Sequence, residues 1–357
     1  MLALGLAPSR ALADEPPPPP PPPSRQITMA FTGDILAHVA VNTRAWKYGD
    51  KLAYDYRPMF ADIEPILSSV DLAVCHLEGP IAPPGVKITG QPVFGSPAGI
   101  AHSIAAVGYD RCSTASNHSM DKGIAGINAT LNAFDAVGLG HSGTARTPEE
   151  AVTPIVDVDG VSVAHLSYSY GFNGGRATVR NAPWRANVID TTAILAAAAD
   201  AKARGAEVVV LSLHWGQEYR SKPTGLQRSV AKTLTASGLI DLIVGHHAHV
   251  LQPIEQINGR WVVFGMGNIV SNQRPITGCP IGSQDGMVVT VEITENPEGG
   301  FTVGVPVAHP TLVDPTTYVA MDVKTRLADP TISNSLRNRL TLSLKRTTKV
   351  VGAFIPA

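Results

Sequence analysis

Residues 240–249 read Ile-Asp-Leu-Ile-Val-Gly-His-His-Ala-His, a largely apolar run followed at once by a cluster of histidines. The run Ile240–Val244 predicts a buried β-strand, and the histidines follow where that strand ends. Neutral imidazole is the commonest protein ligand for zinc and similar metals. An α/β sheet gathers its functional residues at the carboxyl ends of its strands. The stretch therefore predicts a metal site at one edge of an α/β sheet.

The rest of the chain alternates short apolar runs with segments of helical character. The other runs predicted as strands are Ile27–Thr32, Asp71–His76, Tyr109–Ala115, Val161–Tyr168, Glu207–Leu213 and Trp261–Phe264, with a late hairpin at Met287–Ile293 and Phe301–Val307. The segments predicted as helices are Pro58–Ser69, Ala98–Val107, Gly123–Val137, Thr191–Arg204 and Gly225–Ser237. Apolar strands that alternate with helices predict an α/β domain whose sheet is covered by helices.

The composition bounds the function classes. The chain has 357 residues, of which 44% are hydrophobic, so it can bury a sizeable core in one large domain or two ordinary ones. The net charge is −1, from 28 basic and 29 acidic residues, and gives no reason to expect a nucleic-acid partner. The cysteines have no metal-binding spacing. Cys75 and Cys112 lie within predicted strands, so we expect them to be simply buried, without a disulfide framework.

Other predicted strands also end in residues that bind metals or transfer protons. In chain order these residues are Asp34, Glu78, Asn117 with His118, His214 and Asn268. Carboxylates and an amide mixed with imidazoles suit zinc, manganese or iron. Two such metals bridged by one carboxylate would bind a phosphoryl group and activate water. The strand ends together predict one shared metal site.

Each of these residues also has a structural explanation when it is taken singly. Asp34 could cap a helix, Glu78 could be a solvated turn residue, and His214 could be a hydrogen-bonded core histidine. Asn117 could cap a turn through its side chain. These explanations require independent coincidences at one edge of one sheet, so the shared site is favoured.

The motifs, in their order, resemble those of a known family. They are Thr32-Gly33-Asp34-Ile35, His76-Leu77-Glu78-Gly79-Pro80, Ser116-Asn117-His118 with Asp121, His214-Trp215-Gly216-Gln217-Glu218-Tyr219, Gly245-His246-His247-Ala248-His249 and Gly265-Met266-Gly267-Asn268. They are similar to the CapA family of bacterial capsule and poly-γ-glutamate synthesis proteins, over about residues 27–295. That resemblance implies the fold of the calcineurin-like metallophosphoesterase superfamily, a four-layer αββα sandwich.

The resemblance also implies roles for the motif residues. The implied ligands of two divalent metals are Asp34, Glu78, Asn117, His214, His246 and one later histidine, for which His249 is favoured over His247. His118 is implied to act on the leaving group or the oxyanion. Glu218 is either a general base, a contact for a substrate amine, or a partner that orients His214.

The sequence departs from the phosphoesterase pattern at the first metal. Phosphoesterases usually carry a histidine two residues after the first aspartate, where this chain has Leu36. Glu78 stands in place of a bridging aspartate and is longer by one methylene. His38 is either a substitute ligand or a surface residue. One metal position is therefore expected to be weak, and phosphoesterase activity does not follow from the fold alone.

The first residues resemble an export leader. Met1–Pro8 is a short apolar run, and Ala11-Leu12-Ala13 matches a signal-peptidase pattern, although the usual positive residues before the run are missing. Pro16–Pro23 predict a stiff polyproline spacer. We expect a secreted or cell-surface protein, or a cytoplasmic one if the leader is only a disordered segment.

The chain is expected to have three parts. These are the leader and linker at residues 1–25, a CapA-like domain at residues 26–310, and a C-terminal extension at residues 311–357. The basic segment Arg337–Arg346 in that extension is either a surface helix or a mobile tail.

The sequence leaves several functions open. The favoured one is a metal-binding protein of capsule or poly-γ-glutamate biosynthesis that acts on an anionic polymer. The alternatives are phosphoester hydrolysis, with His118 protonating the leaving oxygen, and epimerisation of a peptide substrate in a ribosomal-peptide pathway, with a histidine or Glu218 exchanging protons. A non-catalytic scaffold within a membrane synthase complex is a further alternative. Whether the protein is an enzyme stays open, although a hydrolase-type or acid–base site is expected.

Overall fold

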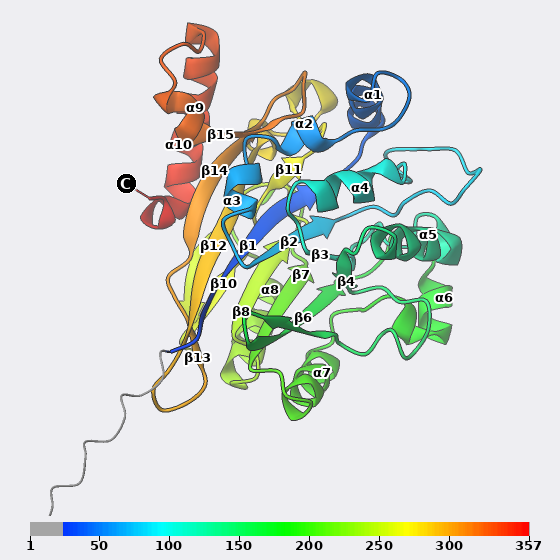
Figure 1. The fold of residues 1–357 in the computed structure, drawn as a ribbon, viewed down its shortest axis with the longest axis vertical. Helices are drawn as coiled ribbons and strands as arrows, with labels where there is room; N and C mark the ends of the chain where they lie inside the picture. Colours follow the sequence, from blue (N-terminus) through cyan, green and yellow to red (C-terminus); the bar gives the residue numbers. More distant parts are fainter. Residues whose placement is uncertain (1–23, 357) are drawn as a thin grey trace, which may run out of the picture.

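The computed structural model describes residues 24–356, and two β-sheets form its centre (Figure 1). The first sheet has the order β15-β14-β12-β1-β2-β3-β4, with β11 paired to β1 and β13 paired to β12. Its strands are β1 (Gln26–Ile35), β2 (Leu72–Leu77), β3 (Arg111–Ser113), β4 (Gly140–Ser142), β11 (Asn268–Val270), β12 (Asp285–Glu295), β13 (Phe301–Val303), β14 (Val307–Val313) and β15 (Ala320–Asp322).

The second sheet has the order β5-β6-β7-β8-β10-β9, and β6, β7, β8 and β10 are parallel. Its strands are β5 (Ile155–Val158), β6 (Val161–Ser169), β7 (Val208–His214), β8 (Leu242–His246), β9 (Ile254–Ile257) and β10 (Arg260–Val263). In the first sheet, β1, β2, β3 and β4 are likewise parallel. Both sheets can therefore present carboxyl ends of parallel strands at one edge.

Helices flank both sheets. Those on the first sheet are α1 (Val39–Tyr48), α2 (Arg57–Phe60), α3 (Glu64–Leu67), α4 (Gly99–Ala106), α5 (Gly123–Asp135), α9 (Val323–Ala328) and α10 (Asn334–Val351). Beside the second sheet lie α7 (Thr191–Ala203) and α8 (Gly225–Ala236), and α6 (Arg176–Asn181) lies near α5. The short 3-10 helices are η1 (Pro183–Arg185), η2 (Pro275–Thr277), η3 (Ile281–Gln284) and η4 (Gly352–Phe354).

Side-chain alternation along the strands assigns each residue to one of these layers. In β1, Met29 and Phe31 pack between the two sheets, whereas Ala30 packs under the helices. In β7, Val208 and Val210 face the first sheet, and Val209 and Leu211 face α7 and α8. Successive side chains of a strand point to opposite faces, so continuously apolar strands require cover on both sides. The predicted four-layer αββα sandwich is confirmed.

The C-terminal residues pack on the first sheet. β14 runs through residue 310, where the sequence placed a domain boundary, and β15 pairs with β14. The segment Arg337–Arg346 lies within α10, so of the two alternatives the helix is present. Arg346 Nη2 and Ser343 Oγ of this helix donate to the buried Asp285 Oδ1 of β12, at 2.7 and 2.6 Å.

The proposed leader lies outside the described residues. Among the described residues, no helix combines the length and the apolar character that crossing a membrane requires.

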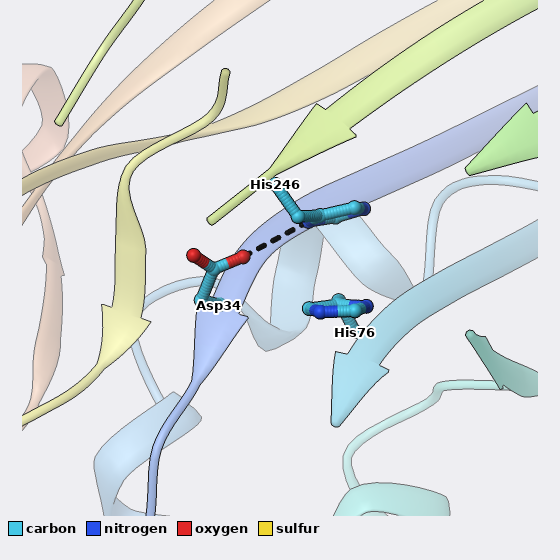
Figure 2. A group of neighbouring side chains, drawn as sticks. All are labelled: Asp34, His76 and His246. Atoms are coloured by element: carbon cyan, nitrogen blue, oxygen red, sulfur yellow. Dashed lines mark hydrogen bonds and ion pairs between the residues drawn. The ribbon is translucent and has the colours of Figure 1, made fainter. Parts of the chain in front are cut away.

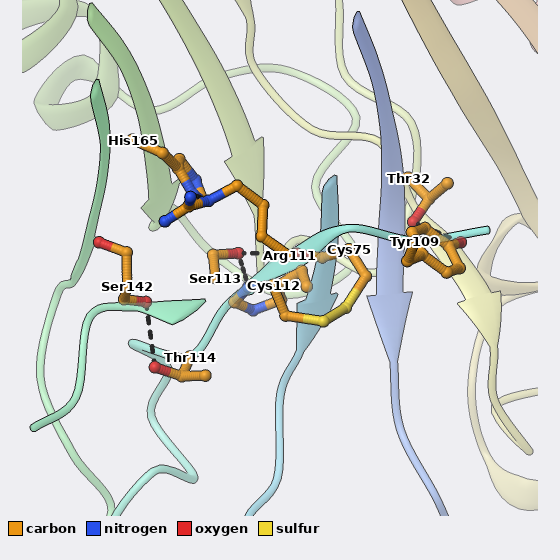
Figure 3. The surroundings of a disulfide bond; sticks show 10 residues. Thr32, Cys75, Tyr109, Arg111, Cys112, Ser113, Thr114, Ser142 and His165 are labelled. Carbon is orange, nitrogen blue, oxygen red and sulfur yellow. Dashed lines mark hydrogen bonds between the residues drawn. A yellow bond between two sulfur atoms is a disulfide. The ribbon is translucent and has the colours of Figure 1, made fainter. Parts of the chain in front are cut away.

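Cys75 of β2 and Cys112 of β3 form a disulfide (Figure 3). Both are buried as expected, but the expectation that they are unlinked is wrong. The two residues are paired in the register of adjacent parallel strands, with Cα atoms 4.4 Å apart. A sequence separation of 37 residues gives no sign of that register.

Reduction of this disulfide should lower the free energy of unfolding by about 3–4 kcal/mol, because it closes a loop of this length in the unfolded chain. Urea unfolding with and without a reductant measures the difference. The variant Cys279→Ala, which removes the free thiol, should respond to the reductant as the wild type does. An unchanged urea midpoint after complete reduction would contradict the prediction.

Candidate metal centre

The strand ends of the two sheets meet at one edge, as the sequence predicted for Asp34, Asn268, His214 and His246. Asp34 on β1 is paired with His76 on β2 and with Asn268 on β11. In the second sheet, His214 at the end of β7 is paired with His246 at the end of β8. All five side chains are almost fully buried. Their polar groups therefore need partners within the site.

Asp34 is satisfied by donors from the histidine cluster (Figure 2). Its Oδ1 accepts from His246 Nδ1 at 3.0 Å, and its Oδ2 accepts from the backbone amide of His247 at 3.0 Å. His249 Nδ1 lies 3.2 Å from the same Oδ2 and 3.1 Å from Asn268 Oδ1. The ring of His246 stacks on His76, with centroids 4.0 Å apart. This side of the site is held by hydrogen bonds.

Glu78, just after β2, differs from Asp34 because no donor reaches its carboxylate. It is 1% exposed, and neither carboxylate oxygen has a hydrogen-bond partner. Its Oε1 lies 3.7 Å from His249 Nε2 and 3.9 Å from His214 Nε2. His214 Nε2 in turn lies 2.9 Å from Asn117 Oδ1. Nδ1 of His247 is also buried without a partner.

This set of atoms fits a metal ion. A buried carboxylate without donors costs several kcal/mol unless a cation is close. Glu78, His247 and His249 each offer one ligand atom, and these atoms lie within 4.8 Å of one another. Asp34, His76 and His246 form a second such group. In that second group, however, the Asp34 oxygens already accept hydrogen bonds, so the unsatisfied group at Glu78 is the better fit.

The protonation of the site follows from the same arrangement. Burial raises the pKa of Glu78 to about 8. Burial lowers the pKa of His249, but the charges of Glu78 and Asp34 outweigh it and raise that pKa to about 10. In the absence of a metal, the Glu78–His249 pair thus retains a proton that metal binding would have to displace.

The turn after β8 directs the histidines. His247 and His249 have φ values of 83° and 54°, in the left-handed region that non-glycine residues rarely adopt. Such backbone costs about 1–3 kcal/mol per residue and is typical of functional sites. Gly245 precedes this turn where a Cβ atom would lie 2.0 Å from the carbonyl oxygen of Phe264. The close packing of β8 against that segment therefore requires glycine.

His118 forms a pair with Asp121. The two lie in the loop after β3, and His118 Nδ1 is 2.6 Å from Asp121 Oδ2. Asp121 Oδ2 also accepts from the amide of Phe94 at 2.7 Å, which fixes its position. Burial lowers the pKa of His118, but the hydrogen bond to Asp121 and the charge of Glu78 outweigh it and raise the pKa. A histidine held in this way suits proton transfer at its other nitrogen.

The remaining predicted residues take different places. Glu218 lies exposed on the loop after β7. His38 is buried, so it is not a surface residue, and its Nδ1 accepts from the amide of Asn272 at 3.3 Å. Sequence reasoning assigned no role to His76, which is the last residue of a predicted strand. Tyr170, just after β6, tilts its ring over His247 with centroids 4.7 Å apart. Only the register of β2 against β1, which pairs His76 with Asp34, could have shown that the side chain of His76 belongs to the site.

A cavity of about 480 Å³ opens beside the site. Tyr170 and Trp215 line one side of it, and Leu226, Gln227 and Val230 of α8 line another. Tyr170 thus borders both this cavity and the ring of His247. The cavity is large enough for a segment of an extended ligand.

A family model described as "Bacterial capsule synthesis protein PGA_cap" matches residues 28–273. The chain belongs to this family. It is 28% identical to the PGA biosynthesis protein CapA of Bacillus subtilis (strain 168) over 284 residues, covering 78% of this chain and 70% of the relative. It is 27% identical to the capsule biosynthesis protein CapA of Bacillus anthracis, covering 70% of this chain and 61% of that relative.

Solved structures share the fold at low sequence identity. The calcineurin-like phosphoesterase YfkN from Bacillus subtilis matches with a TM-score of 0.50 and 15% identity, over 92% of this chain and 99% of that one. The NAD nucleotidase NadN of Haemophilus influenzae matches with a TM-score of 0.50 and 11% identity, over 93% of this chain and 57% of that one. This PGA_cap family member therefore has the metallophosphoesterase fold that its motifs implied.

Without metal, the free energy of unfolding of this family member should fall as the pH rises from about 6 to about 8. The pKa of Glu78, about 8, is above its ordinary value, so the folded state retains a proton that the unfolded state has lost. The raised pKa of His249 acts in the same direction. Urea unfolding of chelator-treated protein measures the slope. Glu78→Gln should flatten it, and a stability that rises over this range would contradict the assignment.

Proposed function

We propose that this protein acts in the synthesis or processing of an anionic capsule polymer of the poly-γ-glutamate class, through a metal-dependent hydrolase-type site. The family match and the printed names of the Bacillus relatives support the polymer. The observation that carries the chemistry is the buried, unpaired carboxylate of Glu78 among histidine nitrogens. A buried carboxylate without donors destabilises the fold unless a cation lies close to it, which supports a bound metal.

The proposed ligands of a divalent metal are the groups whose lone pairs face Glu78. They are Glu78 itself, Asn117, His214, His247 and His249. Imidazole, amide and carboxylate ligands together suit zinc, manganese or iron. We leave His246 outside this set because its ligand atom groups with Asp34 and His76 rather than with Glu78. This differs from the sequence interpretation, which included His246 and favoured His249 over His247.

We propose a second metal, on the Asp34 side, that binds more weakly. Its ligands would have to displace the hydrogen bonds that Asp34 accepts from the histidine cluster. Leu36, where phosphoesterases usually have a ligand, is a buried apolar residue. The Glu78 position is therefore the one that fills first.

The residues around the metal would divide the chemistry. A bound divalent metal supplies a Lewis acid that polarises a phosphoryl or carbonyl group and activates water. His118 keeps its Nδ1 toward Asp121, which leaves Nε2 to protonate the leaving atom. Tyr170 lines the adjoining cavity, where a segment of polymer would lie. We propose that Glu218, exposed on the loop after β7, contacts the substrate.

We propose that this chemistry takes place outside the cytoplasm. The leader-like residues predicted from the sequence and the Cys75–Cys112 disulfide both support export, because disulfides persist in oxidising compartments. Association with a membrane synthase complex is compatible with that location and is proposed only as a consequence of it.

Glu78 should decide metal binding. Zinc added to chelator-treated protein at about 100 times its Kd should stabilise the fold by about 2.7 kcal/mol. Glu78→Gln should lose most of this gain, while its metal-free form should unfold at an equal or higher urea concentration than the wild type. Thermal unfolding and elemental analysis measure both effects.

A matched control for this experiment lies on the surface. Glu150 belongs to a third carboxylate–histidine group with Asp135 and His141, but Arg146 already makes ion pairs with both carboxylates. Glu150→Gln should therefore keep the full zinc response. Equal losses in the two variants would contradict a metal at Glu78.

His118 should decide between catalysis and a scaffold role. In a strain that lacks the wild-type protein, His118→Ala should lower the rate of polymer production about 100-fold or more, since general acid–base catalysis contributes that much. Cell-bound polymer is the measurement, and His141→Ala, another partly buried histidine beside carboxylates, is the control. Normal polymer with His118→Ala, at normal protein level and metal content, would leave only the scaffold.

A further inference from the structure

We propose that His76 is a positioning residue, which together with Ser113 holds the proton of His214 on Nδ1 and so leaves Nε2 of His214 bare toward Glu78. The inference rests on the proposed metal site, but it does not depend on which reaction the site performs. It concerns a residue that is not itself among the proposed ligands of the Glu78 metal.

The first support is a hydrogen-bond chain that runs from β3 to β7. His76 Nδ1 lies 2.7 Å from Ser113 Oγ, and His76 Nε2 lies 3.0 Å from His214 Nδ1. Ser113 Oγ can donate its own proton to the carbonyl of Cys75 at 3.3 Å. The hydroxyl then accepts from Nδ1 of a neutral His76, whose Nε2 in turn accepts from Nδ1 of His214.

The chain has one alternative direction, and a metal selects against it. If Ser113 donates to His76, then His76 donates to His214, and the proton of His214 moves to Nε2, where it meets Asn117 Oδ1 at 2.9 Å. Both directions contain the same number of protons, so they are tautomers. A cation at Glu78 requires the lone pair of His214 Nε2, and only the first direction provides it. The ring nitrogen that binds a metal is set by the hydrogen bond made at the other one.

The second support is that His76 and Ser113 are buried and held in place by the pairing of their strands. His76 and Ser113 are fully buried, so no bulk water can replace either one. They are paired in the register of β2 and β3, one residue beyond the Cys75–Cys112 disulfide that joins the same strands (Figure 3). The ring of His76 stacks on His246 (Figure 2), and it also stacks on His214 with centroids 5.0 Å apart. Removing the acceptor would leave a buried N–H of His214 unsatisfied.

The test compares two His76 variants in zinc affinity, measured by competition with a chromophoric chelator. His76→Phe keeps a buried ring but has no acceptor, and it should weaken zinc binding about 10- to 100-fold. His76→Gln places an amide oxygen near the position of Nε2, so it should restore affinity to within about 3-fold of the wild type, as expected when the acceptor is retained. Urea unfolding of the metal-free proteins should separate any loss of folding from the loss of affinity.

A second pair of variants keeps the test decisive if His76→Phe does not fold. Ser113→Ala removes the hydroxyl partner of His76. Ser212→Ala removes the hydroxyl partner of another buried histidine, His165, at 2.8 Å, and that pair makes no hydrogen bond to a proposed ligand. Ser113→Ala should weaken zinc binding several-fold more than Ser212→Ala does.

The outcomes separate this inference from the proposed metal site. Wild-type affinity in a folded His76→Phe, or equal losses in Ser113→Ala and Ser212→Ala, would overturn the positioning role and leave the metal site intact. A wild-type protein that binds no zinc, manganese or iron would overturn the metal site and this inference together. If zinc affinity falls in His76→Phe and is equally low in His76→Gln, the effect is due to packing, and the positioning role is also overturned.

Discussion

A buried carboxylate without a hydrogen-bond donor, that of Glu78, is the constraint on which the rest of the site depends. The nearest imidazole nitrogens, of His249 and His214, lie 3.7 and 3.9 Å from Glu78 Oε1, too far for a hydrogen bond, and His214 Nε2 lies instead 2.9 Å from Asn117 Oδ1. The neighbouring Asp34, at a similar depth, has the reverse environment and accepts several hydrogen bonds. Two carboxylates at one edge thus differ in kind. Asp34 belongs to the protein's own hydrogen-bond network, and Glu78 is the proposed ligand of a cation.

This contrast requires both sheets. Glu78 and Asp34 come from strands of the first sheet, whereas His214 and the histidine turn come from strands of the second. The apolar layer between the sheets, built from alternate residues such as Phe31 and Val210, fixes the distance across which these groups meet. The packing that stabilises the fold therefore also sets the geometry of the site. A change in the spacing of the two sheets would separate the carboxylates of the first sheet from the histidines of the second.

Much of this arrangement could be predicted from the sequence, because it follows from the pattern of apolar residues and from the polar residues that come directly after each apolar run. Apolar runs predicted the strands, and residues at strand ends predicted which side chains the structure brings together. The disulfide was missed because it depends on the register of Cys75 against Cys112, which local sequence does not encode. The sequence also could not show which of His247 and His249 faces Glu78. Positive φ at His247 and His249 turns neighbouring side chains to different partners, and no periodic pattern describes such a turn.

The position of His76 shows how a strand can serve a site beyond its end. Residues at strand ends supply the proposed metal ligands, whereas His76, two residues before Glu78, contacts Nδ1 of His214, a proposed ligand from the other sheet. Alternation places both on the same face of the chain as it leaves β2. The disulfide and the Ser113 hydrogen bond then act on the same pair of strands, one residue apart. The part of the site that orients the ligands is thus more rigidly joined to the sheet than the loops that carry His118 and Glu218.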